Sequence, residues 1–298
     1  MVLVVVLALG AAAVYGASDF FGAFAARRIH LVTATLFNYA VATIAILLAF
    51  LVVGGTWSSG AVWTGVVSGI FAVFGLLAFY GVLAIGPMSL LSPLIALVQS
   101  VVPVAVAAAT GQGLSVIGWI AIGIGIVAIL LLTPPPKRGE EHISFRGGLL
   151  AAASGLLFGA SLISLDFAPR NSGVIPAIWE IVVGTAILGL AWVVIRSLGS
   201  RATRQLSFLQ PSPEAVSELS GRRAWIAAAA SGVMAALADT FIIVALHRGN
   251  LAVVSVLISL YPVVTVILAA TVLRERMTRL QFVAVGLVIA ASLLFSAS

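Results

Sequence analysis

Charge is scarce in this sequence. Only 15 Lys and Arg and 9 Asp and Glu occur among 298 residues, which is 8% of the chain, whereas 62% of the residues are hydrophobic. A soluble domain carries about 25% charged residues. Because so few charges cannot cover the surface of a water-soluble particle, we expect lipid to solvate most of this protein.

Cysteine is absent, which excludes disulfides, thiol chemistry and cysteine-based metal sites. The sequence also lacks the H-E-x-x-H, P-loop and G-x-S-x-G motifs of common enzymes. We therefore expect no cofactor, no metal ion and no enzymatic activity. The net charge of +6 comes from short basic clusters between apolar runs, such as Arg27-Arg28 and Arg222-Arg223. Such clusters indicate membrane topology, so we do not expect a nucleic-acid partner.

Long apolar runs are abundant, and ten of them reach the length of about 20 residues that spans a bilayer. Lipid offers no partner to free backbone groups, and the runs lack strict alternation, so we interpret them as helices. The sequence predicts an all-α integral membrane protein with ten transmembrane helices. The predicted spans are residues 2–26, 31–53, 61–83, 87–109, 114–132, 147–168, 174–196, 224–246, 251–272 and 278–296.

An internal repeat organises these spans. With an offset of 163 residues, 58–131 align with 221–294 without a gap and share 18 identities in 74 pairs. Upstream of these residues the two repeats align at an offset of 143. The difference between the two offsets corresponds to extra residues in the long loop at 197–223. We therefore predict a first five-helix repeat at 1–132, a linker at 133–146 and a second repeat at 147–298. An odd number of helices per repeat makes the two repeats insert with opposite orientation.

The matched positions that carry most weight are small or polar. They are Ser68/Ser231, Gly69/Gly232, Gly86/Gly249, Ser92/Ser255 and Gly123/Gly286 at the first offset, and 16–18 over 159–161 at the second.

Basic residues lie mostly on one side of the predicted topology. The connections after the odd-numbered helices hold 13 Lys and Arg, and the other side holds only Arg170 and Arg248. The positive-inside rule places the basic side in the cytoplasm and both termini outside.

Several stretches resemble one known family. They are Tyr15-Gly16-Ala17-Ser18-Asp19-Phe20-Phe21-Gly22, then 249–252 leading to Leu260-Tyr261-Pro262, and Leu273-Arg274-Glu275-Arg276-Met277-Thr278 before the last span. In this order and spacing they resemble the EamA-like family of the drug/metabolite transporter superfamily. The resemblance implies a ten-helix basket that transports small metabolites, often by export. It also implies cytoplasmic termini, in disagreement with the arginine count, so the orientation stays open.

Ionisable residues inside spans are functional candidates, because burying a charge in lipid costs about 2.5–3.5 kcal/mol on insertion scales. Asp239 is the deepest, and Asp19 lies in the first span. Both are candidates for substrate binding and for proton coupling. The alternatives are a structural hydrogen bond to another helix for Asp239 and a position near the membrane interface for Asp19. Glu180 either lines a cavity mouth or extends to the interface. Asp166 precedes Arg170 by four residues, so we expect a local ion pair.

Two spans that correspond in the repeat contain prolines, which kink helices. Pro93 and Pro103 lie in 87–109, and Pro262 lies in 251–272. We predict that kinks there shape a central cavity. Its expected polar lining, together with Asp19 and Asp239, is Tyr80, Ser92, Gln99, Ser255 and Tyr261.

These features predict a secondary transporter that works by alternating access. Its expected substrates are small amino-acid-like or drug-like metabolites, and export is one of the expected directions. The expected partners are a small-molecule substrate and the lipid bilayer, with multi-pass insertion in the plasma membrane. The alternatives are a flippase of lipid-linked substrates and a membrane scaffold or sensor without transport. Substrate identity, direction, coupling ion and the choice between monomer and homodimer stay open.

Overall fold

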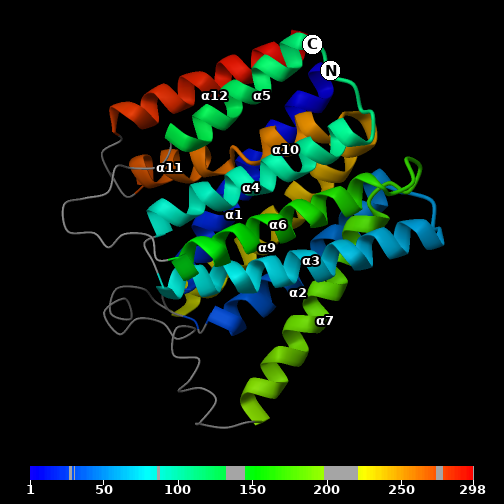
Figure 1. Cartoon of the computed structure of the whole chain (residues 1–298). Coiled ribbons are helices and arrows are strands. Elements are labelled where there is room, and N and C mark those ends of the chain that lie inside the picture. The colour runs from blue at the N-terminus through cyan, green and yellow to red at the C-terminus, as the bar shows by residue number, and fades with distance from the viewer. Residues whose placement is uncertain are drawn as a thin grey trace.

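The computed structural model describes residues 1–26, 29, 31–85, 88–131, 145–197, 221–272 and 278–297. Among these residues there are helices and loops and no strand, which confirms the all-helical prediction. The helices, labelled as in Figure 1, are α1 Val2–Ala26, α2 Leu31–Val53, α3 Ser59–Ile85, α4 Met88–Ala109, α5 Val116–Leu131, α6 Phe145–Asp166, α7 Ile175–Ser197, α9 Gly221–Arg248, α10 Leu251–Ile258, α11 Tyr261–Val272 and α12 Arg279–Ala297.

Each predicted span coincides with a helix to within a few residues, except that 251–272 forms two helices. Most of the predicted linker at 133–146 and of the long loop at 197–223 lies outside the described residues, as does the motif segment 273–277.

Short polar side chains begin several helices. Ser58 accepts a hydrogen bond from the Ala61 N–H at the start of α3. At the start of α12, Thr278 and Gln281 bond each other's backbone N–H groups in a capping box. These side chains bind N–H groups that the first helical turn leaves free.

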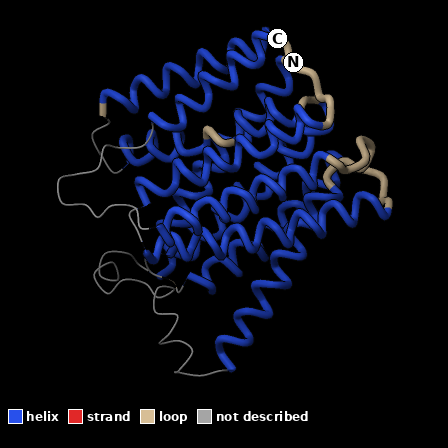
Figure 2. Tube along the Cα trace, viewed as in Figure 1, coloured by secondary structure: helices blue, strands red, loops and turns tan. Residues whose placement is uncertain are grey.

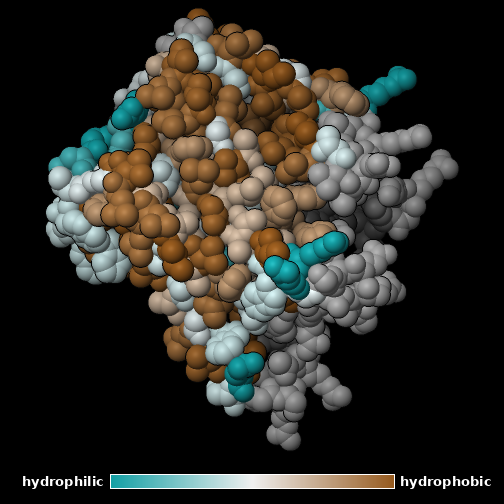
Figure 3. Space-filling view, turned by 180° about the vertical axis from the view of Figure 1, so that it is seen from behind, coloured by the Kyte–Doolittle hydropathy of each residue, from teal (hydrophilic) through white to brown (hydrophobic). Residues whose placement is uncertain are grey.

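The surface of the bundle is apolar. Seven helices are long and apolar enough to cross a membrane, and three shorter apolar helices accompany them among the described residues. Large hydrophobic side chains such as Leu51, Val52 and Phe74 are exposed, and hydrophobic residues cover most of the described part of the face in Figure 3. A soluble monomer rarely exposes so much apolar surface. The protein is therefore a multi-pass membrane protein.

Both chain termini lie at one end of the bundle, which we call the termini end (Figure 1). The loops at 54–58, 110–115 and 167–174 gather at the same end, as Figure 2 shows in tan.

The first five helices interleave with the later ones. α1 packs most extensively on α9, and α3 packs on α6. α2 lies against α9 and α7, α4 lies against α6 and α10, and α5 pairs with α12. The interior therefore consists mainly of contacts between the N-terminal and C-terminal parts of the chain.

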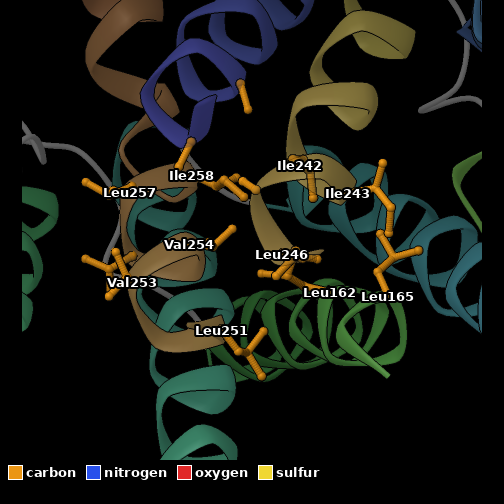
Figure 4. Close-up of a cluster of buried hydrophobic side chains, with 14 of the residues drawn as sticks. Leu162, Leu165, Ile242, Ile243, Leu246, Leu251, Val253, Val254, Leu257 and Ile258 are labelled. Atoms are coloured by element: carbon orange, nitrogen blue, oxygen red, sulfur yellow. The ribbon is translucent and has the colours of Figure 1, made fainter. Parts of the chain in front are cut away.

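Apolar side chains fill the interior near α10. All eight residues of α10 are buried, and the helix packs on α4, α1 and α5. Figure 4 shows its leucines and valines beside Leu162 and Leu165 of α6 and Ile242 and Leu246 of α9. A helix that is apolar on every face suits such a fully enclosed position.

The predicted helix at 251–272 is interrupted at Ser259 and Leu260, between α10 and α11. Pro262 lies in the first turn of α11, where no hydrogen bond within α11 needs its missing N–H. The predicted kink at Pro262 is therefore a break between two helices in this span. Pro93 and Pro103, in contrast, lie within α4, which continues without interruption from Met88 to Ala109.

Candidate functional site

The centre of the bundle contains a buried carboxyl group. Asp239 of α9 is only 7% exposed, and its Oδ1 accepts a hydrogen bond of 3.0 Å from the Tyr15 hydroxyl of α1. The two residues are 224 positions apart in the chain and meet because α1 and α9 form the most extensive helix pair.

A second carboxyl group, that of Glu180 in α7, lies nearby. The Ser161 hydroxyl of α6 donates to Glu180 Oε1 at 3.1 Å, and Ser68 of α3 bonds Ser161 with the two hydroxyl oxygens 2.8 Å apart. Glu180 Oε2 is buried and has no hydrogen-bond partner among the described residues. The charge of Asp239 acts on Glu180, so these carboxyl groups form one electrostatic unit. We call Tyr15, Ser68, Ser161, Glu180 and Asp239 the acidic centre.

The chemistry of the acidic centre follows from its surroundings. No Lys or Arg lies within one helical turn of Asp239 or Glu180 along the sequence. Two neighbouring carboxylates in an apolar environment repel each other and lose the stabilisation that water provides. A shared proton or a bound cation relieves both effects. No group of three or more His, Asp or Glu residues suited to a metal ion occurs in the described part of the chain.

A second polar contact joins α1 to α9. Ser18 Oγ donates to the Ser231 carbonyl at 2.9 Å, and Ser231 Oγ donates back to the Ser18 carbonyl at 2.8 Å. Asn38 of α2 donates to Ser231 Oγ at 2.6 Å. Buried hydroxyls are thus bonded where the helices cross.

At the termini end, Gln112 of the loop after α4 joins parts of the chain that are distant in sequence. Its Nε2 donates to Asp166 Oδ2 at 2.9 Å, and its Oε1 accepts the Leu251 N–H at 3.0 Å. Asn250 donates to the Gln112 carbonyl at 3.4 Å. We call Gln112, Asp166, Asn250 and Leu251 the Gln112 latch.

The expected local ion pair of Asp166 with Arg170 is replaced by these longer-range bonds. α6 ends at Asp166, so Arg170 does not continue the helix, and its guanidinium donates to the Leu246 carbonyl of α9. The charge of Arg170 still acts on Asp166, but the hydrogen bond to the carboxylate comes from Gln112.

Two loops are also joined at the termini end through their backbones. Thr56 N–H donates to the Asn171 carbonyl at 2.9 Å, and Val174 N–H donates to the Gly54 carbonyl at 3.2 Å. Gly173 has φ +55°, and a Cβ there would lie 1.9 Å from Gly54 O. Only glycine permits this approach of the two main chains. The Thr56 hydroxyl adds a side-chain hydrogen bond of 3.0 Å to the Asn171 carbonyl.

The predicted site residues are dispersed. Asp239 joins the acidic centre, whereas Asp19, four residues after Tyr15 on α1, is exposed. Gln99 is half-buried on α4, with its carbonyl facing Gly159 of α6.

The other predicted cavity residues lie along α3, α4, α10 and α11. Ser255 is fully buried and bonds the Ala252 carbonyl of its own helix. Tyr261 is half-buried at the start of α11. Tyr80 and Ser92 belong to α3 and α4, but their side chains lie outside the described residues.

The acidic centre contains four residues that the sequence did not single out as one site. Tyr15 occurs in the family-like motif of the first span, and Ser68 and Ser161 are matched positions of the repeat. These signals identify the helices that matter. They do not reveal that Glu180 reaches Ser161, because that contact depends on how α6 and α7 pack.

Fold and site together define a helical membrane protein with polar groups enclosed by apolar spans. The model of the EamA-like transporter family matches residues 145–297, just over half of the chain. The protein therefore belongs to the EamA-like transporter family, as its sequence motifs indicated.

A solved structure described only as "Crystal structure of protein" has the same fold, with a TM-score of 0.71 and 17% identity over 97% of this chain and 95% of that one. Comparison with curated proteins finds no match.

Proposed function

We propose that the protein is a secondary transporter that moves small metabolites, amino-acid-like or drug-like, across the plasma membrane by alternating access. The proposal includes ten spans arranged as two inverted five-helix repeats, at 1–132 and 147–298. The acidic centre is the single observation that carries it, because a transporter needs groups at mid-depth that respond to a solute or an ion.

The inverted repeat is supported by two serine contacts. The repeat matches Ser68 with Ser231 and Ser18 with Ser161. The structure pairs Ser18 with Ser231 and Ser68 with Ser161. Exchanging the two repeats therefore converts one contact into the other, as a two-fold relation between them requires.

Matched glycines agree with this relation. A Cβ at Gly69 would lie 2.6 Å from the Glu180 carbonyl of α7, and one at Gly232 would lie 2.4 Å from the Asn38 carbonyl of α2. Gly123 and Gly286, in contrast, both face open space. Corresponding positions thus have corresponding surroundings.

The enclosed position of the acidic centre favours transport over a scaffold role. Glu180 Oε2 lacks a hydrogen-bond partner within the described part of the chain, and such a buried acceptor is one that a bound proton or ion could satisfy. Glu180 Oε2 is therefore an acceptor in the acidic centre to which a proton or a cation can bind. We propose Asp239 as the coupling residue and Asp19 as a second candidate on the exposed side of α1.

The termini end supplies the second element of the mechanism. The Gln112 latch and the joined loops at 54–56 and 171–174 connect distant parts of the chain at this end. A small set of discrete bonds that can break together is one way to close and open an end of a transporter. We propose that solute or ion binding at the acidic centre breaks the Gln112 latch.

The test is transport by purified protein in liposomes with an imposed pH gradient and a panel of labelled small metabolites. We expect the gradient to drive accumulation of at least one solute. Asp239→Asn keeps an acceptor for Tyr15, so we expect it to fold and to exchange solute while losing accumulation driven by the gradient. Asp19→Asn reports separately on the second candidate.

Each outcome has a defined meaning. If no solute crosses with any gradient, the transport proposal is wrong and a scaffold or sensor role is favoured. If solute crosses and both variants respond to the gradient like the unaltered protein, coupling through these carboxyl groups is wrong. Movement of lipid-linked substrates alone would favour the flippase alternative.

A further inference from the structure

The interruption between α10 and α11 lies inside the protein. Residues 251–260 are all buried, and Ser259 at the break is fully enclosed. Figure 2 shows the break as a short loop between the two helices in the middle of the bundle. Backbone groups at such a break need partners, because water does not reach them.

Hydrogen bonds at the break leave two carbonyls without their helical donors. In a continuous α-helix, each carbonyl accepts the N–H of the residue four positions later. Here the Leu260 N–H donates to Leu257 O at 3.3 Å, and the Val263 N–H donates to Leu260 O at 3.0 Å. The carbonyls of Val256 and Ser259 therefore do not receive these N–H groups.

Pro262 removes a third donor. It has no N–H, so the carbonyl of Ile258 cannot receive the hydrogen bond that a helix would supply. In addition, the Ser259 hydroxyl is buried and has no hydrogen-bond partner among the described residues. Four oxygen atoms, three of them backbone carbonyls, are thus concentrated within four residues in the interior.

This group of oxygens suits a cation. Carbonyl oxygens can replace the hydration shell of an alkali ion, and broken helices of membrane transporters coordinate ions through unwound carbonyls and helix C-terminal ends. The C-terminal end of α10 carries partial negative charge, which favours a cation. The segment 251–272 has no charged residue, so no basic side chain of its own competes for the oxygens.

We propose that the break between α10 and α11 binds a small dehydrated monovalent cation, of the size of Na⁺, through Ser259 Oγ and the carbonyls of Val256, Ile258 and Ser259. The role of this cation as a coupling ion rests on the proposed transport function. Its binding at the break can be tested without measuring transport.

The break lies at the depth of the acidic centre. Ser259 is eight residues after Leu251, or about 12 Å along a helix, and Asp239 is nine residues before Arg248, or about 14 Å, at a rise of 1.5 Å per residue. Both distances start from the termini end, and α1 contacts both α9 and α10. Asp239 therefore lies at a similar depth in the bundle, where an ionised carboxyl group would help to balance the charge of a bound cation.

The experiment is thermal unfolding of the purified protein during titration with NaCl, with choline chloride held complementary so that ionic strength is constant. We expect Na⁺ to raise the unfolding midpoint by about 5 °C at about 100 times its Kd. Methylammonium chloride and KCl replace NaCl in parallel titrations. Stabilisation by methylammonium alone would overturn the alkali-ion assignment in favour of a substrate ammonium group.

Two variants locate the site. Ser259→Ala removes a hydroxyl that has no partner, so it should leave the midpoint without Na⁺ unchanged while weakening Na⁺ affinity at least tenfold. Pro262→Ala restores the N–H that the Ile258 carbonyl lacks and should also weaken Na⁺ affinity. The matched control is Ser292→Ala, because Ser292 is a buried serine of α12 bonded within its own helix to Val288 O. We expect the control to bind Na⁺ like the unaltered protein.

Equal stabilisation by NaCl, KCl and choline chloride would overturn the proposal, since the break would then hold at most a water molecule. An Na⁺ effect that persists in Ser259→Ala and Pro262→Ala would place the ion elsewhere and would also overturn it. Absence of Na⁺ binding together with pH-driven transport would refute this site alone. Na⁺ binding without any transport would refute the proposed function alone.

Discussion

Gln112→Met should open the termini end. Methionine matches glutamine in length and keeps the packing of the loop, but it loses the hydrogen bonds to Asp166 and to the Leu251 N–H. Side-chain hydrogen bonds in membrane proteins contribute about 0.6 kcal/mol on average and at most about 1.7 kcal/mol. Loss of two such bonds shifts the equilibrium towards the open state by about 1–3 kcal/mol, or ~5- to 150-fold.

The assay uses the absence of cysteine, which removes all background labelling. Ser255 is fully buried in α10, one turn from the Gln112 latch, and its hydroxyl bonds only within its own helix among the described residues. A Ser255→Cys variant in liposomes is treated with a membrane-impermeant maleimide from the termini side. When closure is faster than labelling, the labelling rate follows the population of the open state.

We expect the labelling rate of Ser255→Cys to rise at least fivefold when Gln112→Met is added. The control is Thr110→Val, which lies in the same loop and loses a hydroxyl that bonds only the preceding turn of α4. This control should leave the rate unchanged. Equal labelling with and without Gln112→Met would refute the role of the latch in closing this end.

Two further predictions concern helix packing. Gly69→Ala should lower the unfolding midpoint, at a cost of about 1–3 kcal/mol, because its Cβ would lie 2.6 Å from the α7 main chain. Gly286→Ala is the control and should be tolerated, because open space surrounds Gly286. Equal effects of the two substitutions in a thermal-shift assay would contradict this account. A double-mutant cycle of Ser68→Ala and Ser161→Ala should give a coupling energy of about 0.6 kcal/mol in unfolding measurements, whereas strict additivity would show that their hydroxyl contact contributes nothing.

The positions of the spans could be predicted from the sequence because lipid imposes a simple rule on length and polarity. All ten apolar runs are helical, and boundaries such as Leu31–Val53 agree to the residue. The break within 251–272 could not be placed at Ser259 and Leu260 in advance. A proline indicates that a helix is weakened, but the packing around α10 decides whether it bends or ends.

The candidate site was predictable only in part. Depth along a span identified Asp239, since depth follows from counting residues between interfacial groups. Which side chains meet it was not predictable, because Tyr15 and Glu180 approach from α1 and α7 through the interleaving of the helices. The polar lining expected from Gln99, Ser255 and Tyr261 lies along other helices, so matched positions in a repeat identify regions better than they identify contacts.

The interleaving of the helices has a consequence for biosynthesis. α1 and α2 pack mainly on α9, and α3 packs mainly on α6, and a ribosome produces both of these partners later. The early helices must therefore wait in the lipid with their polar groups, including Tyr15 and Ser68, uncovered. Truncation after α5 should leave a product that membrane quality control degrades, and supplying residues 145–298 as a separate chain should rescue it.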